Sequence, residues 1–204
     1  MNVAVIGLGY IGLPTAALIA SKGIKVVGVD VNKDVINIIN EGKIHIVEPQ
    51  IDILVKSAVN NGNLRATLIP EKADVFILTV PTPLKNKNEP NLSYIKSAAK
   101  AIAPCLEKGN LVILESTSPV GTTEKLMEWM WQERPDLSFP KLGTKEIFDI
   151  AVAYCPERVL PGNVVSELVE NDRIIGGMTI YCSEKANDFY NIFILDMILS
   201  ESNK

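Results

Sequence analysis

Gly7, Gly9 and Gly12 form the pattern GxGxxG near the start of the chain. They directly follow a short apolar run, and Asp30 ends the next apolar run. This arrangement is typical of a loop that binds a dinucleotide. The first glycine allows a tight turn, the second lets a pyrophosphate approach the backbone, and the third lets the following helix pack close to the sheet. A purely structural glycine turn is the alternative, and the strand, helix and Asp30 around the loop argue against it.

Tyr10, Ile11 and Asp30 predict how the dinucleotide is held. The N–H groups of Tyr10 and Ile11 lie at the start of the expected helix, where the helix dipole favours a phosphate. The Asp30 carboxylate can accept hydrogen bonds from the adenosine ribose, and it would repel the 2′-phosphate of NADP. Lys33 is close in sequence, but we expect it to be solvated. The predicted cofactor is therefore NAD.

A second candidate site lies in the segment AYCPERVLPGN, residues 153–163. Glu157 and Arg158 stand between Pro156 and Pro161, just after an apolar run, so a stiffened backbone would fix an acid beside a base. A carboxylate in this setting can act as a general base or order an attacking water, and a guanidinium can bind an anionic substrate. The alternative interpretation is an exposed ion pair that caps a loop.

Two further polar clusters, VPTP and STSPVGTT, also follow apolar runs. Taken alone, each is typical of helix capping. The carboxyl ends of parallel strands, however, share one edge of a sheet, which would place the Thr82 hydroxyl and the second cluster beside the glycine loop.

The elements that must position these residues alternate along the chain. Strands are expected at 3–6, 25–29, 64–68, 74–80, 111–117, 149–155 and 173–177, and helices at 12–22, 32–41, 50–60, 93–106, 121–134 and 184–194. Apolar strands separated by helices predict an α/β fold, a Rossmann-like doubly wound parallel sheet with helices on both faces. Residues 81–91 are expected to form a loop and 135–148 a surface excursion.

The composition argues against several classes of partner. The chain has 204 residues, of which 47% are hydrophobic, and a formal net charge of −4. Neither nucleic acid nor an anionic membrane is expected as a partner, because both favour a basic patch. Cys105, Cys155 and Cys182 are widely spaced, which favours reduced thiols and no metal site. The uncharged stretch at 3–21 is broken by glycines and lacks a basic start, so we expect a cytoplasmic chain without a signal or membrane segment.

Together the motifs resemble the UDP-glucose/GDP-mannose dehydrogenase family. The resemblance rests on IGLGYIGLPTA, VGVDVN, HIVEP, VPTP, ESTSPVGTTE, YCPERVLPGN and RIIGG, and it covers essentially the whole chain. PERVLPG is similar to the branch acting on UDP-linked N-acetylated hexosamines such as UDP-N-acetylmannosamine. The UDP-glucose branch has a second glutamate where this chain has Pro161. UDP-N-acetylglucosamine and UDP-glucose stay open as alternative substrates.

The resemblance implies a four-electron oxidation, in which the C6 alcohol of a UDP-linked sugar becomes a carboxylate and two NAD molecules are reduced. It implies NAD contacts at Tyr10, Ile11, Asp30, Thr82 and Thr123. It places Thr117 and Glu157 near the reacting carbon and its water. It also implies that Arg158 and Val159 contact the nucleotide sugar.

Members of the family are longer than this chain. We expect residues 1–204 to form the NAD-binding Rossmann domain, with the family's central helix and carboxyl-terminal UDP-sugar domain absent. That second half would supply a nucleophilic cysteine, a lysine and most of the sugar pocket. The 204-residue chain alone is therefore expected to be inactive, and the full-length protein to be a homodimer or a higher homo-oligomer.

Other reactive or aromatic residues receive structural interpretations. Cys155, at a strand end, is expected to be structural and not the nucleophile. His45 is expected to pack or to lie at the surface, and Trp129 and Trp131 are expected to pack a helix. Two other hypotheses stay open: a stand-alone NAD-binding module without catalysis, and a two-domain dehydrogenase of small hydroxy acids, against which PERVLPG argues.

Overall fold

The computed structural model describes residues 1–85, 89–141, 146–160 and 162–194. Its strands are β1 (Asn2–Ile6), β2 (Lys25–Val29), β3 (Leu64–Thr67), β4 (Val75–Leu78), β5 (Leu111–Leu114), β6 (Ala151–Tyr154) and β7 (Gly176–Gly177). Its helices are α1 (Gly12–Ser21), α2 (Lys33–Asn40), α3 (Ile51–Asn60), α4 (Ser93–Ile102), the 3-10 turn η2 (Ala103–Cys105), α5 (Thr122–Glu133), α6 (Val164–Glu170) and α7 (Ile180–Ile194).

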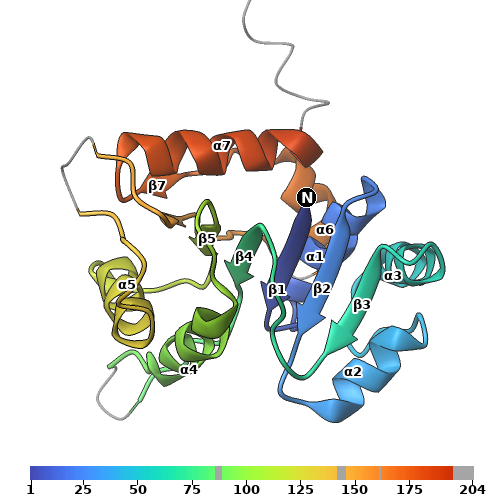
Figure 1. Ribbon diagram of the computed structural model, residues 1–204. Helices are drawn as coiled ribbons and strands as arrows, with labels where there is room; N and C mark the ends of the chain where they lie inside the picture. The colour runs from blue at the N-terminus through green and yellow to red at the C-terminus, as the bar shows by residue number, and fades with distance from the viewer. Residues whose placement is uncertain (86–88, 142–145, 161, 195–204) are drawn as a thin grey trace, which may run out of the picture.

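One sheet forms the centre of the domain, in the order β3-β2-β1-β4-β5-β6-β7. Strands β1 to β6 pair in parallel. Helices α4 and α5 pack together on one face, and α1 and α7 lie on the other (Figure 1). The chain order reverses between β1 and β4, so the fold is the expected Rossmann-like arrangement, and ligands bind such folds at the carboxyl ends of the strands beside this point.

Among the described strands, the last is the one exception within the predicted parallel sheet. Only Gly176 and Gly177 of the expected strand 173–177 pair with β6, and they pair antiparallel to it. The reason is the path of the chain. Glu157, just after β6, and Arg173, just before β7, form an ion pair. The segment between these two residues (the β6–β7 excursion) therefore leaves the carboxyl end of β6 and comes back to the same end. Strand β7 starts from that end and so must run antiparallel to β6.

Several boundaries differ from the predicted ones. Helix α6 was not predicted, because its seven residues are too few to show a clear apolar period. Helix α7 begins at Ile180, four residues earlier than expected. Helix α4 ends before Pro104, which lies in the 3-10 turn. Strands β4 and β5 are shorter than predicted, since Thr79 and Ser116 already belong to the loops that follow them.

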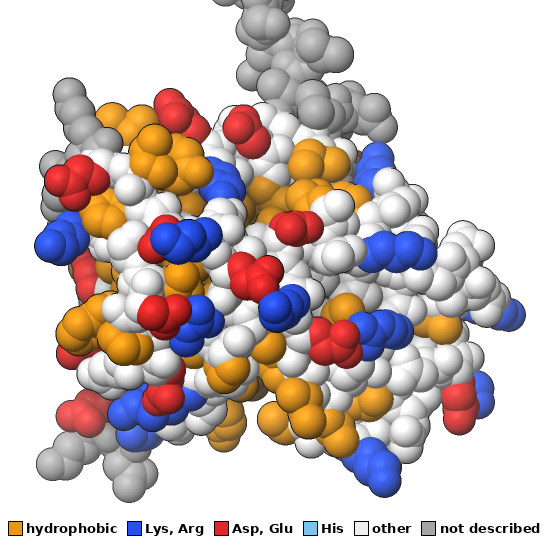
Figure 2. All heavy atoms as spheres, in the orientation of Figure 1, with side chains coloured by type: hydrophobic (Ala, Val, Ile, Leu, Met, Phe, Trp, Pro, Cys, Tyr) orange, Lys and Arg blue, Asp and Glu red, His pale blue; other side chains and the backbone are white. Residues whose placement is uncertain are grey.

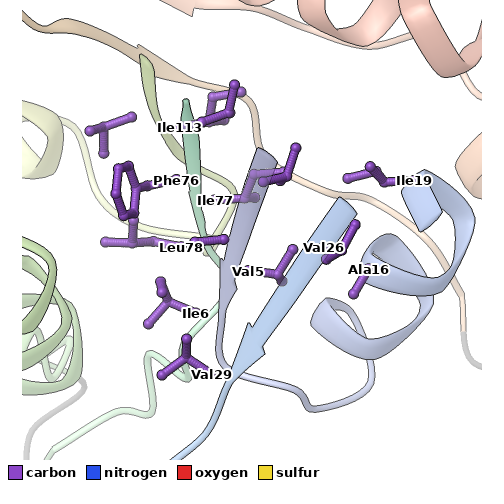
Figure 3. Packing of buried hydrophobic residues seen from close by; sticks show 14 of the residues in the cluster. Val5, Ile6, Ala16, Ile19, Val26, Val29, Phe76, Ile77, Leu78 and Ile113 are labelled. Carbon is purple, nitrogen blue, oxygen red and sulfur yellow. The ribbon is translucent and has the colours of Figure 1, made fainter. Parts of the chain in front are cut away.

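The core explains why the strands read as continuous apolar runs. In β4, Phe76 and Leu78 point to one side of the sheet and Ile77 to the other, and all three are fully buried (Figure 3). Val5 and Ile6 of β1 divide between the faces in the same way (Figure 3). A parallel strand covered by helices on both faces must be apolar at every position.

The surface carries charges of both signs. Figure 2 shows lysine and arginine side chains interspersed with aspartate and glutamate on the face that it draws. Among the described residues, no helix has the length and apolar character needed to cross a membrane.

Candidate NAD-binding and catalytic site

Two glycines of the loop after β1 are required by its packing. Gly7 has a φ of +96°, and a Cβ atom there would lie 3.1 Å from the carbonyl oxygen of Thr79. At Gly12, a Cβ atom would lie 1.8 Å from the Gly7 carbonyl oxygen. The Thr79 hydroxyl donates a hydrogen bond of 2.7 Å to that same carbonyl, which fixes the loop against the end of β4. Gly7 and Gly12 therefore make the tight turn and the close helix approach that their spacing predicts.

Gly9 is different, because nothing in the described fold requires a glycine there. No heavy atom lies within 4 Å of a Cβ built at Gly9, and its φ is not in the left-handed region. Helix α1 begins beside this open space, and its N-cap residue Ile11 makes no side-chain cap. Tyr10 is 50% exposed. A pyrophosphate fits these features, because it needs backbone without side chains at a helix start.

Asp30 connects the loop after β1 to the turn after β2. Its Oδ2 accepts a hydrogen bond of 2.9 Å from the Leu8 N–H, and its Oδ1 accepts one of 2.9 Å from the Asn32 N–H. The sequence did not reveal this structural role. Each carboxylate oxygen keeps capacity for a further hydrogen bond, so the ribose contact is still possible. Lys33 is exposed, as expected.

The loops after β4 and β5 are hydrogen-bonded to each other. The Thr82 hydroxyl donates to the Thr117 carbonyl at 2.6 Å, and the Ser116 hydroxyl donates to the Val80 carbonyl at 2.7 Å. The two polar clusters therefore lie together, as their positions at strand ends predict. The Thr117 side chain is exposed beside this junction.

Helix α5 is not capped by a side chain. Its N-cap is Gly121, with a φ of +86° and no side-chain cap. The Thr122 hydroxyl instead donates to the Pro119 carbonyl at 2.7 Å, which closes the loop before the helix. Thr123, in the first turn, is partly exposed. The capping interpretation therefore fails for this cluster.

Glu157 is buried and paired, although not with its neighbour in sequence. Its side chain is 7% exposed, its Oε2 accepts a hydrogen bond of 2.9 Å from Arg173 Nη1, and its Oε1 accepts one of 2.8 Å from the Arg158 N–H. The exposed Arg158 guanidinium donates to the Asp172 carbonyl at 2.8 Å. The interpretation of an exposed Glu157–Arg158 ion pair is therefore wrong. Val159 is half-buried next to them. Pro161 lies outside the described residues.

Three residues around Glu157 were not recognised from the sequence as part of a site. The Tyr190 hydroxyl, on α7, donates to Glu115 Oε1 at 2.7 Å. Arg173 Nη1 lies 3.9 Å from the same oxygen, and its guanidinium carbon lies 4.6 Å from the centre of the Tyr190 ring. Burial raises the pKa of Glu115 to about 7, although Arg173 opposes the shift. For two of these residues the sequence offered a signal, namely a charge at the edge of an apolar run: Glu115 in LVILEST and Arg173 in RIIGG.

The comparisons with known proteins agree with this geometry. The model of the NAD-binding domain of the UDP-glucose/GDP-mannose dehydrogenase family matches residues 1–194. The chain belongs to this family. It is 65% identical over 194 residues to the UDP-N-acetyl-D-mannosamine dehydrogenase of Campylobacter jejuni, covering 95% of this chain and 47% of that protein. It is 59% identical to an NDP-N-acetyl-D-galactosaminuronic acid dehydrogenase of Ralstonia nicotianae, covering 95% of this chain and 45% of that one.

Solved structures show the same domain. The UDP-N-acetyl-D-mannosamine dehydrogenase of Pyrococcus horikoshii superposes with a TM-score of 0.86 at 43% identity, over 95% of this chain and 45% of that one. This family member therefore spans about half the length of the relatives it matches, and the half that it spans is the NAD-binding domain.

The three cysteines are partly or fully buried. Cys155 is fully buried, and burial raises its pKa to about 11, which keeps the thiol protonated. Burial also raises the pKa of Cys105, and Cys182 is buried against β6. Within the described ranges, no group of three or more His, Cys, Asp or Glu side chains could hold a metal ion.

The remaining expectations concern packing. His45 is half-buried, and its Nδ1 is buried without a hydrogen-bond partner among the described residues. Trp129 packs against the core, with Lys96 over its ring. Trp131 is 52% exposed, so the packing prediction is wrong for it.

Proposed function

We propose that this chain is the NAD-binding half of a UDP-N-acetyl-D-mannosamine 6-dehydrogenase. The observation that carries the proposal is the position of Glu157. The excursion from β6 to β7 holds this carboxylate, nearly buried, at the sheet edge where the glycine loop opens. The 65% identity to a UDP-N-acetyl-D-mannosamine dehydrogenase supports the choice of sugar.

The residues that would hold NAD lie on both sides of the point where the strand order reverses. The backbone at Gly9, Tyr10 and Ile11 would bind the pyrophosphate, and Asp30 would bind the adenosine ribose. Thr82 and Thr123 extend the site. When bound, NAD accepts a hydride from the sugar carbon.

The other half of the site would handle the sugar and water. Oxidation of the C6 alcohol to a carboxylate consumes one water and two NAD, and it releases protons with the two NADH. In the reaction that the family implies, a water attacks a thioester of C6, its proton goes to Glu157, and the carbon–sulfur bond breaks. Thr117 would lie near the reacting carbon, and Arg158 and Val159 would contact the nucleotide sugar.

A second sugar is favoured by one observation. The relatives at 59% and 57% identity are NDP-N-acetyl-D-galactosaminuronic acid dehydrogenases, so the NAD-binding half alone does not separate the two substrates. A homo-oligomeric, cytoplasmic enzyme stays a prediction, as does the alternative of an NAD-binding module without catalysis.

Two measurements test the proposal. Calorimetry of the 204-residue chain is expected to show NAD binding with clear preference over NADP, and Asp30→Asn is expected to reduce that preference. Equal or tighter NADP binding by the parent chain would contradict the NAD assignment. In the complete dehydrogenase, two NADH are expected for each UDP-N-acetyl-D-mannosamine consumed. Faster turnover of UDP-N-acetylgalactosamine, UDP-N-acetylglucosamine or UDP-glucose would overturn the choice of sugar.

A further inference from the structure

Arg173 supplies the guanidinium that contacts the Glu157 side chain. Its Nη1 donates to Glu157 Oε2 at 2.9 Å, and only 10% of the arginine side chain is exposed. The residue comes from the segment that returns to the sheet before β7, sixteen positions further along the chain. Arg158, the basic neighbour in sequence, uses its guanidinium elsewhere.

The guanidinium of Arg173 is held from several sides. Its Nη2 donates to the Leu168 carbonyl at 3.1 Å at the end of α6. The Tyr190 ring lies beneath it at 4.6 Å, and Glu115 Oε1 is 3.9 Å from Nη1. Glu115 is itself fixed by the Tyr190 hydroxyl. Residues from the end of β5, from α6 and from α7 therefore hold this arginine in a single orientation.

Stability alone is a poor explanation for this cluster. Burying an ion pair costs desolvation free energy that its Coulomb attraction often does not exceed. Two buried polar atoms of the cluster, Glu115 Oε2 and Arg173 Nε, have no hydrogen-bond partner among the described residues. Incomplete satisfaction of this kind is found where a site serves function at a cost to stability.

The distances within the cluster favour one pairing. Arg173 Nη1 lies 2.9 Å from Glu157 Oε2 and 3.9 Å from Glu115 Oε1. Only the first of these distances is that of a hydrogen bond. Burial raises the pKa of Glu115 to about 7, which weakens the negative charge that this carboxyl group presents near neutral pH. The guanidinium of Arg173 therefore hydrogen-bonds to the Glu157 carboxylate.

We propose that Arg173 is the positioning residue for Glu157: it orients the carboxylate that takes the proton of the attacking water, while Glu115 and Tyr190 hold the arginine from beneath. This inference rests on the proposed function, in which Glu157 acts on that water. The competing explanation is that Arg173 only fastens the excursion between β6 and β7.

The test uses the complete dehydrogenase and follows NADH in the first turnover and in the steady state. Glu157→Gln is expected to keep the initial burst of NADH and to lower the steady rate by about a hundredfold, because hydrolysis of the acyl enzyme slows. Arg173→Met is expected to give the same pattern, with a steady rate lower by about ten- to a hundredfold. The KM for the UDP-sugar and the affinity for NAD are expected to change less than about threefold, because the Arg173 side chain is only 10% exposed.

Three further variants distinguish a role of Arg173 in orienting Glu157 from a role in only stabilising the segment between β6 and β7. Arg173→Lys keeps the positive charge and is expected to restore most of the steady rate. The double variant of Glu157→Gln with Arg173→Met is expected to be no slower than Glu157→Gln alone, because both changes remove the same function. Arg65→Met is the matched control, since Arg65 makes its pair with Glu71 on the surface and away from the site.

The outcomes are distinguishable. If Glu157→Gln turns over like the parent, the proposed role of Glu157 fails. If that variant is slow but Arg173→Met is normal, or if the two losses multiply in the double variant, the inference about Arg173 is wrong. If Arg173→Met does not fold, Arg173→Gln, which keeps hydrogen-bond donors without the charge, is measured against the same expectations.

Discussion

The two sides of the sheet edge are built in opposite ways. On the β1–β2 side, the site consists mainly of backbone, namely the glycine loop and a helix start, with one side-chain carboxylate, that of Asp30, which accepts hydrogen bonds from two N–H groups. On the β5–β6 side, it consists of buried side chains: Arg173 contacts Glu157, Glu115 and Tyr190, and Tyr190 hydrogen-bonds to Glu115. On the first side, substitutions are restricted by steric fit, because one added carbon atom either collides with the fold or fills the open space over the loop. On the second side, they are restricted by charge, because carboxyl groups and a guanidinium are buried together away from water.

This difference shows how the two functions depend on the fold. A backbone site needs only a short segment in the right conformation. A side-chain cluster needs several distant segments to dock at once, so its chemistry responds to pH and to changes elsewhere in the domain. The following predictions test this contrast, from the largest expected effect to the smallest.

The largest effect is expected on the backbone side. Gly9→Val is expected to weaken NAD binding by about a thousandfold, or about 4 kcal/mol, because its side chain would occupy the open space over the loop. The melting temperature of the 204-residue chain is expected to stay nearly unchanged. Gly12→Ala is the contrasting variant and is expected to destabilise the fold itself, since its Cβ would lie 1.8 Å from the Gly7 carbonyl oxygen. Normal NAD binding by Gly9→Val, measured by calorimetry, would show that the site is misplaced.

The next effect tests the buried charges. Burial raises the pKa of Glu115 from its ordinary 4.5 to about 7, so the fold favours the protonated carboxyl. Its contribution to the free energy of unfolding is therefore complete below pH 4.5 and is lost as the pH rises through 7. Relative to Glu115→Gln, the parent chain is expected to lose up to about 1.4 kcal/mol per pH unit in this window, and about 3 kcal/mol across it.

Urea denaturation of both chains between pH 4 and about 8 measures this difference. Glu71→Gln is the control, because hydrogen bonding to Arg65 lowers the pKa of that exposed carboxyl and moves its effect below this window. A difference between parent and Glu115→Gln that does not vary with pH would mean that Glu115 is charged in the fold.

Arg158 tests whether the exposed part of the PERVLPG segment binds substrate. Arg158→Ala in the complete dehydrogenase is expected to raise the KM for the UDP-sugar by about ten- to a hundredfold, which corresponds to a lost charged hydrogen bond of about 1.5–3 kcal/mol. In Arg158→Ala, the amount of NADH formed in the burst is expected to equal that of the parent enzyme when the same amount of sugar is bound. Arg65→Ala serves as the surface control. An unchanged KM would remove Arg158 from the substrate site.

The smallest effect concerns the bond between the loops after β4 and β5. Thr82→Val removes the 2.6 Å hydrogen bond to the Thr117 carbonyl and is expected to cost about 1 kcal/mol, with a fall in melting temperature of about 2–4 °C. NAD binding is expected to weaken a few fold as well. Thr67→Val removes a similar hydrogen bond of 2.8 Å, to the Ile69 carbonyl, at the end of β3. That control is expected to lose stability without losing NAD affinity, and an equal loss of affinity in both would show that Thr82 acts only through stability.

The sequence by itself determined the strands, most of the helices, the Rossmann-like order and the glycine loop. Each of these depends on residues that are neighbours along the chain: apolar runs, helical periods and the spacing of Gly7, Gly9 and Gly12. The family motifs also brought Glu157 to notice. All of these features can be read without knowing how the segments dock.

The tertiary structure alone decided the ionic partner of Glu157, the direction of β7 and the convergence of Glu115 and Tyr190. The partner next in sequence, Arg158, was the wrong one, and the right one follows sixteen positions later at the end of an excursion. Tyr190 reaches Glu115 across 75 positions because α7 packs against β5 and β6. Contacts of this kind depend on how helices and returning loops dock on the sheet, and no local pattern of residues encodes that docking.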